Sequence, residues 1–319
     1  MYSSTNQSED KFNSFMKSVY MAFSKEDLSF VSTFAAILDE KEDKKIIRPL
    51  RRKLSNETFV KCLLYIAKTG CGWKYLSELK FVDVHYQTVY KRFEQLVRRK
   101  VISKVWSSIL NCYSDFMLEK NPKWFEILAI DTSMFNNISG CETVGKNHYD
   151  RCRLGTKMSA VVDEARVPVS LSFYAANIHD SLTTLPSIDA IGCKIKLDNR
   201  YKNTIGADSA YISKQTTQLL KARKIDLVAS KRKNMRRSRP LTLLQRNALR
   251  KRVVVEHTFC HVKKFKRLKT RSEKRISFYE AMHQFIAALR TFRQLLHVDG
   301  SLIRVNKLLL PLTTVVQDF

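Results

Sequence analysis

The sequence lacks any apolar run close to the roughly 18 residues that a membrane-spanning helix needs. It also lacks a secretory signal, because its first ten residues, Met-Tyr-Ser-Ser-Thr-Asn-Gln-Ser-Glu-Asp, are polar. We find no internal repeat either. These absences argue against a membrane protein and a secreted protein, and they predict a soluble, intracellular chain with no membrane partner.

Paired cysteines are missing as well. The seven cysteines are odd in number and form no CxxC pair, which predicts reduced thiols rather than a disulfide framework or a four-cysteine zinc site. His257, Cys260 and His261 lie close enough in sequence to raise the possibility of a metal, but no fourth ligand follows at a typical spacing. Packing within a helix is the favoured interpretation of these three residues.

Acidic residues are scarce. The chain holds 30 Asp plus Glu against 57 Lys plus Arg, a formal net charge of +27. The excess is concentrated between residues 221 and 275, where 21 Lys or Arg face only Asp226, Glu256 and Glu273. Such clustering indicates a polyanionic partner and favours nucleic acid over a membrane surface.

The first part of the chain has a helical pattern. Residues 1–25 are polar and predict a flexible segment. Apolar residues recur at helical spacing over 28–38 and again over 57–68, separated by a charged connection. Ser55 is placed to cap the start of the second helix, and Gly70 to end it.

A helix-turn-helix pattern follows. Residues 72–76 and 86–96 predict two helices joined by a turn, the second carrying Lys91 and Arg92. A helical scaffold with a merely basic face is an equally good interpretation. The pattern continues to about Glu119, where Asn121-Pro122 ends it. We therefore predict a helical, DNA-binding domain over 26–120.

After Trp124 the pattern changes to strands. A short apolar run ends on Asp131, two further strands follow, and residues 204–207 form another run that ends on Asp208. A long helix then carries Glu256. The order strand, strand, strand, helix, strand, helix, strand, helix predicts an α/β class. Specifically, we expect an RNase H-like mixed sheet with flanking helices over 121–300, preceded by an all-helical N-terminal domain and followed by a C-terminal tail over 301–319.

Asp131, Asp208 and Glu256 are candidate catalytic and metal-binding residues. They are separated by 77 and 48 residues, so only the fold can bring them together. Three carboxylates suit two Mg²⁺ ions, with Mn²⁺ as the substitute, for in-line displacement at a phosphodiester. The alternatives are ordinary ones: an Asp at a strand end is often a turn former, and Glu256 could pair with Arg252 on a helix surface.

Several motifs resemble the DDE transposases of bacterial insertion sequences, most closely the insertion sequence 5 family and its Harbinger-like relatives. Arg252, Glu256 and Lys263 fit the family's Tyr-x2-Arg-x3-Glu-x6-Lys motif, with Leu249 at the tyrosine position. The other matching segments are Ile130-Asp131-Thr132-Ser133, Gly206-Ala207-Asp208-Ser209-Ala210-Tyr211, Asp150 to Lys157, Ala176-Asn177-Ile178-His179-Asp180, Phe265 to Lys274 and Thr69 to Leu76. The likeness covers roughly residues 45–295.

The resemblance implies a transposase that binds transposon ends and catalyses metal-dependent cleavage and strand transfer of DNA. Asp131, Asp208 and Glu256 would hold the metals, Arg252 and Lys263 would face phosphates of the transposon end, and Arg271 would contact DNA. The basic loop would touch DNA through Lys231, Arg232, Lys233, Arg236 and Arg237.

The implied partners are double-stranded DNA, as terminal inverted repeats and target, and at least one further copy of the chain. The protein would then work in a bacterial cytoplasm or nucleoid, or in a eukaryotic nucleus. Two alternatives remain open: a transposase-derived DNA-binding protein without catalysis, and another RNase H-like DNA nuclease.

Overall fold

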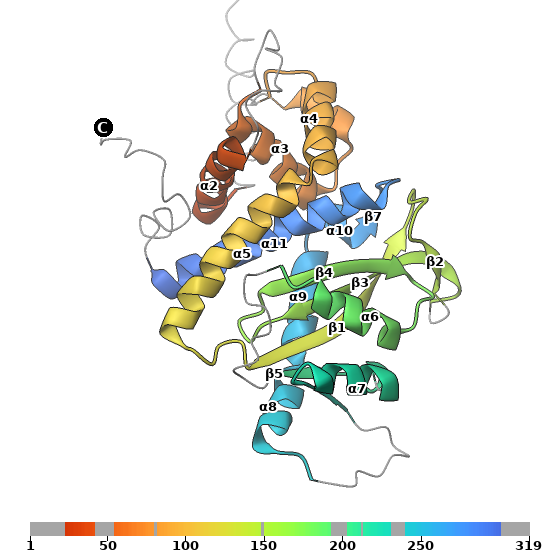
Figure 1. The fold of residues 1–319 in the computed structure, drawn as a ribbon. Coiled ribbons are helices and arrows are strands. Elements are labelled where there is room, and N and C mark those ends of the chain that lie inside the picture. Colours follow the sequence, from red (N-terminus) through yellow and green to blue (C-terminus); the bar gives the residue numbers. More distant parts are fainter. Residues whose placement is uncertain are drawn as a thin grey trace, which may run out of the picture.

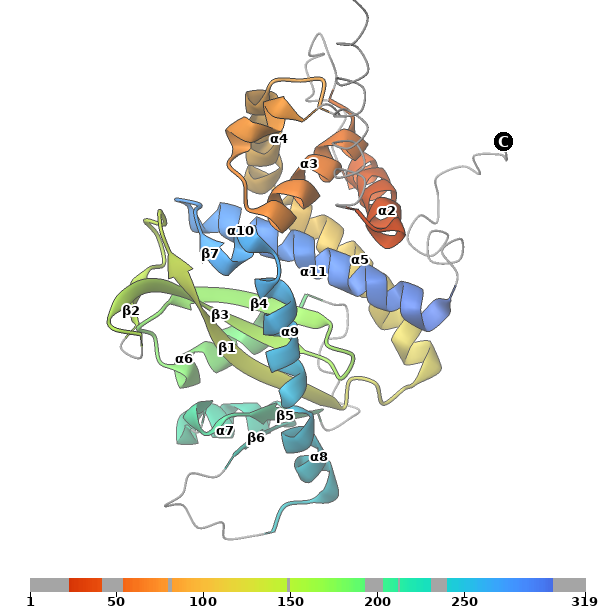
Figure 2. The same cartoon turned by 180° about the vertical axis from the view of Figure 1, so that it is seen from behind.

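The computed structural model describes residues 23–41, 54–79, 82–147, 150–192, 203–211, 213–230 and 240–300. Helices gather at one end of the molecule and a twisted sheet lies in the middle (Figure 1). The other end is formed by strands β5 (Asn203–Ala207) and β6 (Ile225–Ala229) with helices α7 (Lys214–Ala222) and α8 (Leu243–Lys251) (Figure 2). Most of the predicted flexible segment, the basic loop at 231–239 and the predicted tail lie outside the described residues.

The N-terminal part is helical, as predicted. The second helix begins at Ser55, whose side chain accepts a hydrogen bond from the backbone N–H of Thr58, and ends at Gly70 in the left-handed conformation (φ 73°). Both ends match their predictions. The first half of the predicted helix-turn-helix is instead a short 3-10 helix. The elements are α2 (Lys25–Lys41), α3 (Asn56–Thr69), η2 (Trp73–Glu78), α4 (Tyr86–Arg98) and α5 (Val101–Lys120).

The sheet has an RNase H-like strand order. Strands β4, β3, β1, β5 and β6 are neighbours in that order, antiparallel from β4 to β1 and parallel from β1 to β6. The first and fourth strands of this core therefore lie side by side, which confirms the predicted fold class. The strands are β1 (Ile127–Asn137), β2 (Gly145–Asn147), β3 (Arg153–Val162), β4 (Pro168–Ala175), β5 (Asn203–Ala207), β6 (Ile225–Ala229) and β7 (Thr270–Arg271).

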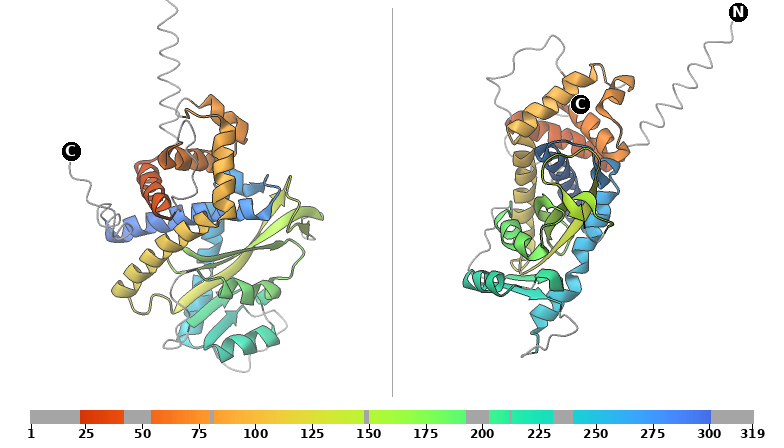
Figure 3. Two further views of the ribbon diagram at one scale, coloured as in Figure 1. Left: turned by 45° about the horizontal axis from the view of Figure 1, so that its top comes forward. Right: turned by 90° about the vertical axis from the view of Figure 1, so that its right-hand side faces the viewer.

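Helices cover both faces of the sheet. Helices α6 (Asp180–Asp189) and α7 (Lys214–Ala222) lie on one face, and α8 (Leu243–Lys251) and α9 (Val253–Lys263) lie on the other (Figures 2 and 3). The α9 face that packs on the sheet includes Val255, Phe259 and Val262, whereas Val253 is 44% exposed.

The long helix α11 (Ile276–Asp299) joins the helical part to the sheet. It follows the short helix α10 (Lys266–Lys269) and is buried along most of its length. Its Arg293 makes an ion pair of 2.8 Å with the buried Asp27 of α2, which also contacts Lys68 of α3. Burial raises the pKa of Asp27, but the hydrogen bond from Lys68 and both positive charges leave it below its usual value. The division into domains at residue 120 stays a prediction.

Two elements differ from their predictions, and a third, α6, contains a proline. Strand β1 does not end at Asp131 but continues to Asn137, because β3 and then β7 supply hydrogen-bonding partners there. The long helix is divided at Arg252, whose N–H bonds to the carbonyl three residues back. Pro186 lies inside α6 and does not break it, since the N–H of Ala190 still donates to the Pro186 carbonyl.

Candidate active site

Parallel pairing of β1 with β5 brings Asp131 and Asp208 together. The paired residues Ile127 and Thr204 differ by 77 in number, and so do the two acids. Opposed residues of neighbouring strands project to the same side of a sheet, so both carboxylates project to one side where β5 ends and β1 continues. Asp208 is exposed, and the Asp131 side chain retains 19% of its exposure.

The two aspartates are held in the same way. The Oδ1 atom of Asp131 accepts a hydrogen bond from the N–H of Thr132 at 2.8 Å, and that of Asp208 accepts one from the N–H of Ser209 at 2.7 Å. The Oδ2 atom of Asp131 meets Nη1 of Arg252 at 3.2 Å. One oxygen of each carboxylate is thus fixed by its own backbone.

Arg252 connects two of the three acids. Its Nη2 lies 2.9 Å from Oε1 of Glu256, one turn along the helix, while Nη1 reaches Asp131 on β1. The predicted surface pair of Arg252 and Glu256 is therefore present, but it is not isolated. A single guanidinium therefore contacts both Glu256 and the carboxylate that precedes it by 125 residues.

Gly206 allows helix α8 to approach β5. A Cβ atom at this position would lie 2.3 Å from the carbonyl oxygen of Ala248, so only glycine permits this contact. Gly206 precedes Asp208 by two residues, and Ala248 precedes Arg252 by four. The close contact therefore sets the distance between the end of β5 and the start of α9.

Burial raises the pKa of Asp131 to about 6. In reaching this value, the hydrogen bond from the N–H of Thr132 and the charge of Arg252 oppose the rise in pKa, while the negative charges of Asp208 and Asp180 add to it. The carboxylate is therefore in an environment that disfavours its charge more than one guanidinium can offset. Another cation beside Asp131 would relieve this cost.

Sequence reasoning did not identify a role for two residues near Asp131, which are Asp180 and Tyr211. Asp180, at the start of α6, accepts hydrogen bonds from Oγ1 of Thr132 and Nζ of Lys157. Tyr211 is fully buried, and burial together with the charges of Asp131 and Asp180 raises its pKa. Asp180 and Tyr211 both stand in segments that resemble the transposase motifs, and this was the only available signal.

The donor set suits a hard divalent cation. Carboxylate oxygens alone are the ligands that Mg²⁺ and Mn²⁺ prefer. Within the described part of the chain, no three Asp, Glu, His or Cys side chains converge on one point closely enough to hold an ion. Arg252 instead supplies positive charge to Asp131 and Glu256. The chemistry of the residues fits Mg²⁺, and the Arg252 guanidinium would compete with the ion for the carboxylates.

Besides Arg252, three of the predicted DNA contacts are at or near the surface. Lys91 is exposed on α4, and the neighbouring Arg92 donates to Oδ1 of Asn56 at 2.8 Å. Lys263 is partly exposed, with its Nζ 5.2 Å from the centre of the Phe135 ring. The predicted contacts in the basic loop lie outside the described residues: Lys231, Arg232, Lys233, Arg236 and Arg237.

Arg271 does not fit the predicted DNA contact. Its side chain is fully buried. Its guanidinium donates to the carbonyl oxygens of Glu142 at 2.6 Å and Lys274 at 3.0 Å, and to Oγ1 of Thr156 at 2.8 Å. Because these N–H groups donate to acceptors inside the protein, Arg271 connects the end of the β1–β3 pair to the loop before α11. This burial corrects the prediction.

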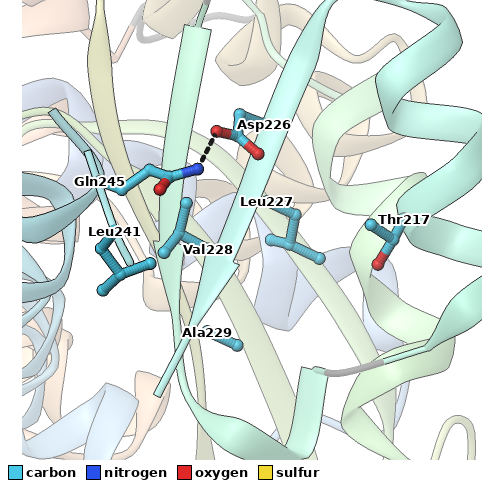
Figure 4. A pocket seen from close by; sticks show the side chains of 7 residues that line it. All are labelled: Thr217, Asp226, Leu227, Val228, Ala229, Leu241 and Gln245. Atoms are coloured by element: carbon cyan, nitrogen blue, oxygen red, sulfur yellow. Dashed lines mark hydrogen bonds between the residues drawn. The ribbon is translucent and has the colours of Figure 1, made fainter. Parts of the chain in front are cut away.

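A small pocket lies away from the three acids, between β6, α7 and α8. Gln245 donates to Oδ2 of Asp226 at 2.8 Å across it (Figure 4). The remaining lining residues are Thr217, Leu227, Val228, Ala229 and Leu241. This pocket brings no further carboxylate to the candidate site.

Of the helices in the described ranges, none is long and apolar enough to cross a membrane.

The strand order defines an RNase H-like α/β fold, in which Arg252 contacts both Asp131 of β1 and Glu256 of α9. Residues 126–290, just over half of the chain, match the family described as "Transposase DDE domain". A relative from Burkholderia cepacia, "Putative transposase for insertion sequence element IS402", is 30% identical over 166 residues, covering 51% of this chain and 75% of that protein. The chain belongs to the DDE transposase family and is a DNA transposase.

Two solved structures are more distantly similar. The piggyBac transposase synaptic complex with hairpin DNA is 12% identical, covers 92% of this chain and 79% of that one, and has a TM-score of 0.45. The Mos1 strand transfer complex is 10% identical, covers 83% and 81%, and has a TM-score of 0.30. These scores are too low to support an argument about the fold, which rests on the strand order.

Proposed function

We propose that Asp131, Asp208 and Glu256 hold two Mg²⁺ ions, or Mn²⁺ in their place, and form the active site for DNA cleavage and strand transfer. The chemistry supplied by the bound ions is activation of an attacking water or 3′-hydroxyl and stabilisation of the leaving oxygen at a phosphodiester. The observation that carries this proposal is the position of Arg252, which bridges Asp131 and Glu256 while the strand register sets Asp208 beside Asp131.

The chain's own residues prepare this site before any DNA is bound. The backbone N–H groups of Thr132 and Ser209 orient the first two carboxylates. Arg252 reduces the repulsion among the acids, which would amount to roughly 1 to 4 kcal/mol per pair at about 4 Å. With the carboxylates neutralised by bound ions, the Arg252 guanidinium would be free to meet a phosphate of the transposon end.

We propose double-stranded DNA as the partner, in the form of terminal inverted repeats and target. The net charge of +27 and the family support this, and the two solved relatives are described as a complex with hairpin DNA and a strand transfer complex. Lys91, Arg92, Arg252 and Lys263 are the proposed contacts within the described residues. Cutting two ends in one event favours at least a dimer.

The test is Mg²⁺-dependent nicking of a duplex that contains a transposon end. Asp131→Asn and Glu256→Gln should each lower the nicking rate by on the order of 1,000-fold, because each loses several kcal/mol of charge stabilisation at the reacting phosphate. DNA binding, measured by gel shift, should persist. Asp189→Asn is the matched control, since that acid is exposed and pairs only at the surface with Arg223.

Three outcomes would contradict this proposal. Full cleavage by either active-site variant would remove the carboxylates from the mechanism. A wild-type protein that shifts end-containing DNA but leaves it uncut in both Mg²⁺ and Mn²⁺ would instead be a DNA-binding derivative without catalysis. Preference for branched DNA over terminal repeats would indicate a different RNase H-like nuclease.

A further inference from the structure

Thr132, the residue after Asp131, points to the opposite face of the sheet. Successive side chains of a strand alternate between faces. Asp131 meets Arg252 at the start of α9, whereas Oγ1 of Thr132 donates to Oδ1 of Asp180, the first residue of α6, at 2.9 Å. The peptide between Asp131 and Thr132 is therefore held from both faces.

Asp180 is itself fixed by Lys157 of β3. The Nζ atom of Lys157 lies 2.6 Å from the same Oδ1 atom and also donates to the carbonyl oxygen of Ile178. The Lys157 side chain is only 5% exposed, and that of Asp180 is 26% exposed. A charged pair removed from water in this way keeps a defined geometry, because the lysine would lose its acid if the pair opened.

We propose that Asp180 is a positioning residue for the proposed active site, acting on Asp131 through the Thr132 hydroxyl. Asp180 holds Thr132 against α6, and the Thr132 N–H holds Oδ1 of Asp131 at 2.8 Å. The conformation of the first metal-binding carboxylate is thus set from behind the sheet. This inference rests on the proposed function of Asp131 and adds a specific role for the segment Ile178-His179-Asp180.

The sharpest variant is Thr132→Val, which removes the hydroxyl and keeps a β-branched side chain in the strand. Loss of a residue that orients a metal ligand weakens metal binding by roughly 10-fold or more. We expect this loss in Mn²⁺ binding to the full-length protein without DNA, measured by electron paramagnetic resonance. Thr132→Ser, which retains the hydroxyl, should restore binding to within about twofold of the wild type.

Asp180→Ala provides a second variant. It removes the acceptor altogether, so Mn²⁺ binding should weaken at least as much as in Thr132→Val. It should also lower the melting temperature, because Lys157 loses its acid. Asp189→Asn, on the same helix, is the control and should bind Mn²⁺ as the wild type does. If Thr132→Val does not fold, Asp180→Ala carries the same comparison.

The outcomes separate this inference from the proposed function. If the wild type binds Mn²⁺ and Thr132→Val binds it equally well, or if Thr132→Ser is as weak as Thr132→Val, the positioning role is wrong and the active site stands. If the wild type and Asp131→Asn bind Mn²⁺ with the same affinity, the proposed metal site itself is wrong, and the inference falls with it.

Discussion

Asp131 and Asp163 are two carboxyl groups with the same raised pKa in very different surroundings. Burial raises the pKa of each to about 6. Asp163, at the turn between β3 and β4, is fully buried and accepts hydrogen bonds from the Tyr113 hydroxyl at 2.6 Å and from Nε1 of Trp124 at 3.0 Å. Asp131 keeps some exposure and has Arg252 beside it.

The difference shows that a raised pKa alone does not identify an active site. Asp163 accepts hydrogen bonds from three neutral donors: the Tyr113 hydroxyl, the Trp124 indole N–H and, at 2.8 Å, the N–H of Val167. These contacts tie α5 and the start of β1 to the turn. Asp131 instead has further acids near it and access to solvent, which are the conditions under which a cation can bind. Asp163 connects parts of the fold, whereas Asp131 has the surroundings that its proposed role requires.

Substituting the two carboxyl groups in turn should produce its largest difference in the free energy of unfolding. Asp163→Ala leaves the Tyr113 hydroxyl, the Trp124 indole N–H and the Val167 N–H buried without their acceptor. We expect a loss on the order of 4 kcal/mol in the free energy of unfolding, measured with urea. Asp131→Ala should change it by less than about 1 kcal/mol, since its ion pair is partly exposed. Equal losses for the two variants would contradict the assignment.

The second largest effect should be on how the free energy of unfolding depends on pH. The folded-state pKa of Asp163 is about 6, above its usual value of 3.8, so its contribution is present below about pH 4 and is lost as pH rises through about 6. The difference amounts to on the order of 3 kcal/mol. Subtracting the unfolding curve of Asp163→Asn from that of the wild type isolates this change from His283, whose lowered pKa acts in the opposite sense. If the difference between the two curves does not change from pH 4 to 7, Asp163 makes no such pH-dependent contribution to stability.

Gly206→Ala should have a smaller effect that reaches the active site. The added Cβ must push the Ala248 carbonyl away, so we expect a loss of about 1 to 3 kcal/mol in unfolding free energy. DNA cleavage should also slow, because Glu256 moves with α8. Gly192→Ala is the matched control, since a Cβ there would lie an ordinary 3.8 Å from its nearest neighbours. Identical cleavage rates for the two variants would contradict the role of Gly206.

The smallest expected effect is a selective pKa shift. Adding Mg²⁺ should lower the apparent pKa of Asp131 by about one unit, because a nearby cation favours the charged form, and should leave Asp163 unchanged. Carboxyl carbon resonances followed by NMR through a pH titration measure both groups at once. A shift at both acids, or at neither, would show that they do not differ as described.

Local patterns predicted most of the fold. Ser55 and Gly70 mark the ends of α3, and the short apolar runs mark β5 and β6, because caps and strand composition depend on neighbouring residues alone. The true length of β1 could not be predicted in this way, since its last residues are extended by pairing with β3 and β7.

The site was predictable only in part, for the same reason. The motifs drew attention to the three acids, and the register then placed two of them side by side. The burial of Arg271 depends on acceptors from three separate segments, which the resemblance that implied a DNA contact does not reveal. Asp180 attracted attention only as part of a segment that resembles the transposase motifs, because nothing in the sequence links it to Thr132.

The contact of Gly70 with Lys266 limits how related transposases can exchange parts. A Cβ at residue 70 would lie 2.9 Å from that of Lys266, and Nη1 of Arg267 donates to the Cys71 carbonyl at 3.3 Å. Both basic residues lie within four positions of the end of α9, which carries Glu256. A helical region from a relative would therefore need glycine at this position to be joined to the present catalytic region. Recombinants without it would inherit a displaced α10, whatever DNA sequence their helices recognise.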